Sequence, residues 1–454
     1  MKTTAYINNK INKFNKTVYV PGDKSLSIRF VLLASQAIGK SIAYNILRSE
    51  DIISALNAIK KLGIHYKINK NICEVYGRGL NGLKFKNNTV INAGNSGTLA
   101  RLIFGLLINS KNTIILKGDK SLSKRDFSRV IKPMRMFGQN IKSKTNKLPI
   151  IVKGTNFSRP INYFESRGSA QVKSSILLAA MKTPGITKIK CIASRDHTEN
   201  LFKYLNLPIK IIREKKFETI TFNGKKNYKG FNYTIPGDIS SASFFIVLTI
   251  LSKNSKLLIK NVNVNRSRTG IIDILKKMNA KIFLKNKKNY NGEHVADIFV
   301  KSSKKLKSIN CPKEMNSRTI DEFLLIFLSC SMAKGVSRFK GIGELRHKET
   351  DRLKFANNFL NRIGIKTKVT KDSLNIYGNP NLKLNKTYKI KNFDKDHRIC
   401  MMSIIAALTL EGKAKFIIHD LDSIKTSFPN FIQILKSLGA KINWQKKILF
   451  FQSQ

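Results

Sequence analysis

This chain has few cysteines, no long apolar run and no recognisable secretory leader. Its five cysteines are scattered and form no C-x-x-C pair, which excludes a disulfide scaffold and a zinc ribbon and indicates reduced thiols. The longest apolar runs, such as FFIVLTIL at 244–251, are well short of the roughly 20 residues that span a bilayer. The first residues, MKTTAYINNKINKFNK, are polar and basic, unlike a secretory signal. We therefore expect a cytoplasmic protein without a membrane partner.

Acidic residues are also scarce. The chain has 27 of them against 84 lysines and arginines, a formal net charge of +57, which taken alone suggests a nucleic-acid partner. However, lysine is spread along the whole sequence, and no basic stripe interleaved with aromatic residues is present. We interpret most lysines as a solvated surface and expect no specific nucleic acid. A basic RNA-binding protein remains the alternative from another functional class.

Three common sequence motifs of metal, phosphate-binding and catalytic serine sites are missing. No H-E-x-x-H or other metal spacing involves the six histidines, so no metal site is predicted. The P-loop pattern G-x-x-x-x-G-K-[ST] is absent. No serine stands in a G-x-S-x-G elbow. The chemistry must therefore come from another set of residues.

Internal repetition is the main positive feature. PGDKSLSIR at 21–29 is echoed by PGDISSASF at 236–244, and only the first copy carries cations at its fourth and ninth positions. Helical patterns that end in an apolar residue plus Gly also recur, with 75 residues from Gly63 to Gly138 and again from Gly364 to Gly439. Six units of this period fill the chain, and each is long enough for a small α/β module. In the first of them, a helix is predicted to begin after Ser49 and end at Gly63.

Polar cationic clusters precede apolar helices in several of these units. Lys24, Ser25 and Arg29 stand where a helix should begin, and free amides at such a start make an anion cradle. In NAGNSGTLAR at 92–101, Gly97 allows close approach of a ligand and Thr98 is a candidate helix cap. Either segment could instead be an ordinary capped helix. Together, the clusters suggest a substrate pair rich in phosphate and carboxylate groups.

The densest cluster is ELRHKETDRL at 344–353. Glu349 and Arg352 form an i, i+3 pair, which for an isolated segment is more simply a surface salt-bridge ladder. Asp321 precedes the apolar LLIFL, where a carboxylate that faces the apolar side would be costly unless it is used. Arg398 in DHRICMM again stands before an apolar helix.

Taken in order, these motifs resemble the 5-enolpyruvylshikimate-3-phosphate (EPSP) synthases over the full length of the chain. The motifs are PGDKSLSIR, GNSGTLAR, GDKSLSKR, SAQVKSSILLA, SRDHTE, PGDISSASFF, ELRHKETDR, DHR and SFPNF. The resemblance implies an α/β fold of two lobes, each an inside-out barrel of three βαβαββ units. Lobe one would comprise residues 1–20 and 237–454 and lobe two residues 21–236, with the active site in the cleft between them.

The resemblance also implies an activity: the enolpyruvyl group of phosphoenolpyruvate passes to shikimate 3-phosphate, by addition and then elimination, with release of phosphate. Asp321, Glu349 and Lys24 would be catalytic. The residues implied to bind shikimate 3-phosphate are Lys24, Ser25, Arg29, Ser169, Ala170, Gln171, Ser194, Asp321 and Lys348. Those implied to bind phosphoenolpyruvate are Lys24, Gly97, Arg125, Gln171, Arg352, Arg398 and Lys425. No cofactor is implied, and the family suggests a monomer.

The chain departs from the family pattern in places. Some members carry a Lys directly before the T/S-F-P triplet, whereas here that position is Thr426 and Lys425 stands one residue earlier, so the role of Lys425 stays open. Gly97 is the residue associated with glyphosate-sensitive enzymes. The nearest alternative is the sister enzyme that uses UDP-N-acetylglucosamine and typically carries a reactive Cys or Asp in a loop; GDKSLSKRDFSRV has no Cys, and the SLSKR and HKETDR motifs favour shikimate.

Overall fold

The computed structural model describes residues 2–303 and 305–447, which divide into two compact units. Unit 1 comprises residues 1–20, 237–288 and 295–454, and unit 2 comprises residues 21–236 and 289–294. Each unit has its own hydrophobic core. The chain changes units next to Pro21 and Pro236, where the two PGD motifs stand.

Three sheets form unit 2. The first contains, in spatial order, β14 (Asn232–Thr234), β3 (Ile38–Tyr44), β5 (Ile72–Arg78) and β4 (His65–Asn69). The second contains β6 (Thr89–Asn92), β7 (Thr113–Lys117), β9 (Ile150–Lys153) and β8 (Asn140–Lys142). The third contains β10 (Asn162–Glu165), β11 (Ile186–Ile192), β13 (Phe217–Asn223) and β12 (Ile209–Arg213). In each, the first pair is parallel and the other two pairs are antiparallel.

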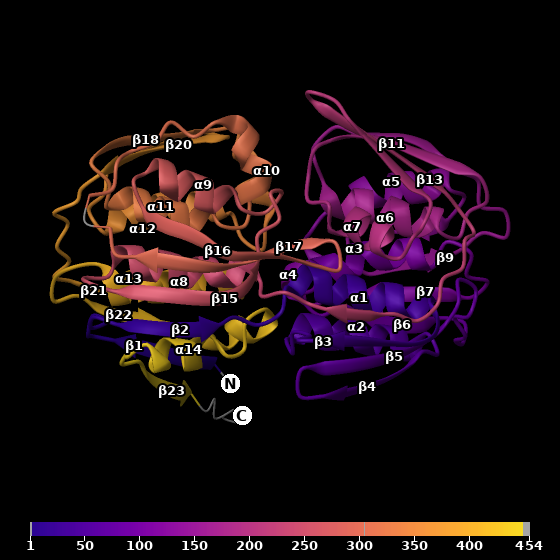
Figure 1. The fold of residues 1–454 in the computed structure, drawn as a ribbon, viewed down its shortest axis with the longest axis horizontal. Coiled ribbons are helices and arrows are strands. Elements are labelled where there is room, and N and C mark those ends of the chain that lie inside the picture. The colour runs from indigo at the N-terminus through magenta and orange to yellow at the C-terminus, as the bar shows by residue number, and fades with distance from the viewer. Residues whose placement is uncertain (1, 304, 448–454) are drawn as a thin grey trace, which may run out of the picture. The chain divides into compact units, whose positions relative to one another are not determined.

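Three further sheets belong to unit 1. One contains β16 (Lys281–Tyr290), β17 (Glu293–Lys301), β15 (Lys256–Asn263) and β2 (Asn15–Tyr19). Another contains β18 (Gly335–Lys340), β20 (Ser373–Gly378) and β19 (Thr367–Val369). The last contains β21 (Thr387–Ile390), β22 (Lys415–Ile418), β1 (Lys2–Ile7) and β23 (Asn443–Lys447). In Figure 1, the indigo strands β1 and β2 accordingly lie among the orange and yellow strands of the C-terminal part.

The helices alternate with these strands. Those of unit 2 are α1 (Lys24–Gln36), α2 (Glu50–Lys61), α3 (Gly97–Leu106), α4 (Lys120–Ser123), α5 (Ser128–Met136), α6 (Ala170–Ala180) and α7 (His197–Tyr204). Those of unit 1 are α8 (Ile239–Leu251), α9 (Gly270–Lys277), α10 (Asn316–Thr319), α11 (Phe323–Ser331), α12 (Arg352–Arg362), α13 (His397–Thr409) and α14 (Phe431–Ser437). Three short 3₁₀ segments also belong to unit 1: η1 (Lys313–Met315), η2 (Gly343–His347) and η3 (Leu421–Thr426).

The helices lie inside and the sheets outside. Every residue of α11 is buried, and in α8 only the last residue is not, whereas a strand such as β11 alternates between exposed and buried positions. A helix buried on all sides needs apolar residues around its whole circumference, and FFIVLTIL within α8 supplies them. The α/β fold expected from the sequence is confirmed, and the six sheets in the described part of the chain match the six expected modules.

The helix predicted between Ser49 and Gly63 is confirmed, although the side chain of Ser49 makes no capping hydrogen bond. It begins after Ser49 as α2, and Gly63 follows its end with a φ of +85°. This left-handed conformation is one that favours glycine, which explains the recurrent apolar-Gly ending. Gly364 and Gly439 have φ values of +88° and +97° at the corresponding ends of α12 and α14.

Candidate active site

The first cations that the sequence singled out stand at the start of α1 in unit 2. The cap of this helix is Asp23, whose Oδ1 accepts a hydrogen bond of 3.0 Å from the amide of Leu26. Nζ of Lys24 lies 3.0 Å from Oδ2 of Asp51 in the first turn of α2. Asp51 was not among the residues predicted to form the site, so this ion pair is an addition. The ion pair orients Lys24, and one-fifth of the lysine side chain remains exposed.

Arg29 lies one turn further along α1 and is only 4% exposed. Its Nη1 donates to the carbonyl oxygen of Ser25 at 3.0 Å, and the rest of its guanidinium faces hydroxyl groups of α6 and α7. Such a buried guanidinium is not the ordinary surface cation of the simpler interpretation.

Gly97 and Arg125 are neighbours, as their shared assignment to phosphoenolpyruvate requires. A Cβ atom at position 97 would lie 2.9 Å from Nη1 of Arg125 and 2.9 Å from Nη1 of Arg101. Nη2 of Arg125 also donates to Oδ1 of Asn95 at 3.2 Å. A side chain at position 97 would therefore force at least one of the two guanidinium groups to shift.

The cap of α3 differs from the prediction. Oγ of Ser96, not the side chain of Thr98, accepts the hydrogen bond from the amide of Leu99, at 3.3 Å. Thr98 is already the second residue of the helix, which is too late for a cap. Its hydroxyl accepts instead from Nε2 of Gln171 at 3.1 Å. This bond brings Gln171, another candidate, to the start of α3.

The remaining candidates of unit 2 stand at helix starts. Oγ of Ser169 caps α6 by accepting from the amide of Val172, and the amide of Ser169 donates to Glu165 at 2.7 Å. Ala170 is the first residue of α6. Ser194 lies between β11 and α7, and its buried Oγ has no hydrogen-bond partner among the described residues.

In unit 1, Asp321 is the centre of the candidate group. Its Oδ1 lies 3.6 Å from Nζ of Lys348 and 3.7 Å from Nη1 of Arg352, and its Oδ2 lies 3.8 Å from Nη2 of Arg398. Nη1 of Arg398 also donates to the carbonyl oxygen of Asp321 at 2.9 Å. Arg398 is 77 positions from Asp321 in the sequence, so the fold brings distant cations together around one carboxylate.

The Glu349–Arg352 pair exists, but it is not a surface ladder. Nη2 of Arg352 donates to Oε2 of Glu349 at 2.6 Å, and the arginine side chain is only 2% exposed. Its Nε also donates to the fully buried Asp396 at 2.8 Å. Burial would lower the pKa of Arg352, but Asp396 and Glu349 outweigh it and raise the pKa above its usual value. Arg352 is therefore a permanent cation held between carboxylates.

The sequence suggests a buried carboxylate at Asp321, but the fully buried one is that of Glu322, the next residue. Glu322 is fully buried, whereas the side chain of Asp321 is 17% exposed. Glu322 accepts a hydrogen bond from the hydroxyl of Ser240, and its Oε1 lies 3.6 Å from Nη1 of Arg398. The apolar run after Asp321 shows that a carboxylate is buried there, but not which one.

Lys425 forms an ion pair within its own 3₁₀ segment. Its Nζ pairs with Oδ1 of Asp422 at 2.7 Å, within η3, and its side chain is 62% exposed. Thr426, which takes the place of the family's Lys, is buried and lies 3.3 Å from Nδ1 of His397.

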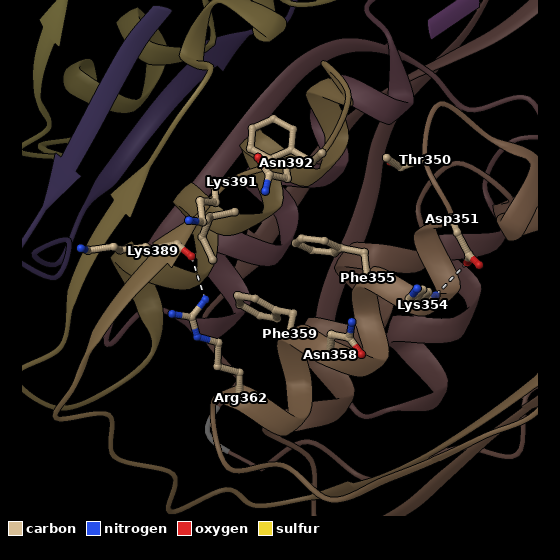
Figure 2. A pocket seen from close by; sticks show the side chains of 12 residues that line it. Thr350, Asp351, Lys354, Phe355, Asn358, Phe359, Arg362, Lys389, Lys391 and Asn392 are labelled. Atoms are coloured by element: carbon tan, nitrogen blue, oxygen red, sulfur yellow. Dashed lines mark hydrogen bonds between the residues drawn. The ribbon is translucent and has the colours of Figure 1, made fainter. Parts of the chain in front are cut away.

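A separate pocket of about 400 Å³ opens beside α12. Figure 2 shows the rings of Phe355 and Phe359 projecting from the helix toward the segment that carries Lys391 and Asn392. Thr350, at its edge, donates to Asp396, so the pocket adjoins the candidate group, although none of the candidates lines it.

The described residues hold neither a metal cluster nor a membrane-spanning helix. Among residues 2–303 and 305–447, no group of three or more His, Cys, Asp or Glu side chains could hold a metal ion. Within the same ranges, no helix is both long enough and apolar enough to cross a bilayer.

Comparison with known proteins addresses the family. Residues 8–435 match the model of EPSP synthase (3-phosphoshikimate 1-carboxyvinyltransferase). The enzymes of that name from Ruthia magnifica and Vesicomyosocius okutanii are each 39% identical, over 95% and 96% of this chain and 97% and 98% of theirs. The EPSP synthase structure from Acinetobacter baumannii has a TM-score of 0.84 and 32% identity, covering 98% of this chain and 100% of that one. The chain therefore belongs to the EPSP synthase family.

Proposed function

We propose that this chain transfers the enolpyruvyl group of phosphoenolpyruvate to the 5-hydroxyl of shikimate 3-phosphate and releases inorganic phosphate. This is the step of the shikimate pathway that leads toward chorismate and the aromatic amino acids. Membership of the family along residues 8–435 supports the activity. The observation that carries the chemistry is the pair of carboxylates, Asp321 and Glu349, that share the buried cation Arg352.

The residues of unit 2 bind and orient the substrates. Shikimate 3-phosphate contacts Lys24, Ser25, Arg29, Ser169, Ala170, Gln171 and Ser194. Phosphoenolpyruvate contacts Lys24, Gly97, Arg125 and Gln171. Two features support these roles: the groups stand at helix starts, where free amides favour anions, and Lys24 and Arg29 are oriented by bonds within the unit.

The residues of unit 1 perform the proton transfers. Lys348 contacts shikimate 3-phosphate, and Arg352 and Arg398 contact phosphoenolpyruvate, with Lys425 as a less direct candidate. Asp321 accepts the proton of the 5-hydroxyl group while the hydroxyl oxygen forms a bond to the central carbon of the enol. Glu349 delivers a proton to the methylene carbon. In the second half, the methyl group returns a proton to Glu349 and the C–O bond to phosphate breaks, which releases phosphate and restores the carbon–carbon double bond.

Electrostatics favours this division of labour. A carboxylate and a cation about 4 Å apart attract by about 4 kcal/mol at an effective dielectric of 20. The three cations around Asp321 therefore stabilise its negative charge, which suits a group that accepts a proton.

The function is tested by phosphate release from phosphoenolpyruvate. We expect release with shikimate 3-phosphate as acceptor and none with UDP-N-acetylglucosamine. Release only with the nucleotide sugar would assign the chain to the sister activity. No release with either acceptor, together with RNA affinity that falls steeply with salt, would favour the RNA-binding alternative.

The protein works in the cytoplasm as a monomer. The five cysteines are all free, and those at 73 and 330 are buried thiols whose pKa burial raises to about 12, which suits structural residues in a reducing compartment. Size-exclusion chromatography with light scattering checks the monomer.

A further inference from the structure

The guanidinium of Arg29 is held by two hydroxyl groups that the sequence analysis did not single out. Its Nε donates to Oγ1 of Thr198 on α7 at 2.8 Å, and its Nη2 donates to Oγ of Ser174 on α6 at 2.9 Å. The two hydroxyls lie 2.7 Å apart and bond to each other. With the bond from Nη1 to the carbonyl of Ser25, each nitrogen of the group has a fixed acceptor. The guanidinium plane is therefore fixed, which matters because its donors form a rigid fork.

A buried ion pair stands next to these hydroxyls. Nζ of Lys173 lies 2.5 Å from Oε1 of Glu199, and their side chains are 0% and 1% exposed. Glu218 on β13 adds a second carboxylate 3.9 Å from the same Nζ. Burial would lower the pKa of Lys173, but Glu199, Glu218 and Cys191 together outweigh it and raise the pKa, so the lysine stays charged.

This ion pair explains why the hydroxyls converge. Lys173 and Ser174 are consecutive on α6, and Thr198 and Glu199 are consecutive on α7. The pair thus ties the two helices together where their hydroxyls meet. Buried pairs of this kind add little net stability over apolar residues, but they fix one arrangement, because an unpaired buried charge is costly.

From these contacts we propose that Ser174 and Thr198 are positioning residues that orient Arg29 toward shikimate 3-phosphate, with the Lys173–Glu199 pair holding their helices in register. The inference rests on the proposed function, which places Arg29 on that substrate. The hydroxyls carry no charge and do not touch phosphoenolpyruvate in this scheme. Their loss leaves an N–H of a buried guanidinium without its acceptor, so Arg29 must turn away to find another.

The test compares Thr198→Val and Ser174→Ala with a matched control. Thr183 is a buried threonine of the same unit whose hydroxyl bonds only to the carbonyl of Ala179 in the preceding helical turn. Thr183→Val therefore removes an equally buried hydroxyl away from Arg29. We expect Thr198→Val and Ser174→Ala each to raise KM for shikimate 3-phosphate about tenfold, the loss of one hydrogen bond to a charged group. KM for phosphoenolpyruvate should change less than twofold, as should both constants in the control.

Two further variants separate the possible failures. Thr198→Ser keeps the hydroxyl and should restore KM for shikimate 3-phosphate, whereas a merely structural role for the methyl group would leave it impaired. Arg29→Met tests the site itself. If it leaves shikimate 3-phosphate binding unchanged by calorimetry, the placement of Arg29 in the proposed function is wrong. If Arg29→Met abolishes binding while Thr198→Val and Ser174→Ala behave like the control, only the positioning inference is overturned.

Discussion

Replacing Asp396 by Asn should lower the stability of unit 1 and disturb the orientation of Arg352 in the candidate site. Asp396 is fully buried and accepts from Nε and Nη2 of Arg352 at 2.8 and 3.1 Å, and from the hydroxyl of Thr350 at 2.9 Å. It also accepts from the amide of Arg398 at 3.0 Å. One carboxylate thus orients the guanidinium of Arg352 and caps the helix that carries Arg398.

The magnitude follows from these bonds. Asparagine keeps one oxygen acceptor but replaces the other oxygen with an NH₂ donor that faces the guanidinium. Breaking a buried charge pair typically costs about 3–5 kcal/mol, and because Glu349 still neutralises Arg352, we expect the lower end, about 3 kcal/mol. For a unit of this size, that loss lowers Tm by about 6–12 °C. The misoriented arginine should also raise KM for phosphoenolpyruvate about tenfold or more, with less change for shikimate 3-phosphate.

Calorimetry and steady-state kinetics measure both effects. Asp394→Asn is a matched control, because Asp394 is exposed, lies two residues earlier, and has a φ of +44° that asparagine tolerates. If Asp396→Asn shifts Tm and KM no more than Asp394→Asn does, the central role of Asp396 is refuted.

Other predictions concern both units. Gly97→Ala should raise KM for phosphoenolpyruvate severalfold and alter glyphosate inhibition, since its Cβ would displace the guanidinium of Arg125; an unchanged KM would contradict this close approach. Glu349→Gln should bind both substrates by calorimetry yet lose most phosphate release, and normal turnover would remove its role as acid. Burial lowers the pKa of Lys182 to about 7, so the unfolded chain binds more protons between pH 7 and 10.5, and stability should rise with pH across that window. Lys182→Met should therefore raise Tm most below pH 7 and flatten the pH profile, whereas the exposed control Lys188→Met should change neither.

Sequence reasoning succeeded where the determining signals are local. The ending of α2 at Gly63 follows from one left-handed residue, and the six modules follow from a repeated spacing. The cap of α3 was wrong because Ser96 and Thr98 are both plausible caps, and only the start of the helix distinguishes them. Glu322 was missed for a similar reason, since adjacent carboxylates point to different sides of the chain.

Partners far apart in sequence could not be predicted. Arg352 and Asp396 are 44 positions apart, and Arg29 and Thr198 are 169 apart. No periodicity links such pairs, because the fold rather than the local pattern brings them together. The motifs indicated which side chains carry charge, but the residues that orient them became apparent only from the contacts.

The placement of strand β1 has a consequence for biosynthesis. Its residues 2–7 pair with β22 on one side and β23 on the other, so this strand lies between strands that begin only at residues 415 and 443. While a ribosome translates the chain, residues 21–236 can already collapse around their own core, but residues 2–7 must wait for their partners until residues 415–447 have been made. The many charged and polar residues of MKTTAYINNKINKFNK suit such a delay, because they discourage aggregation of a strand that has no early partner.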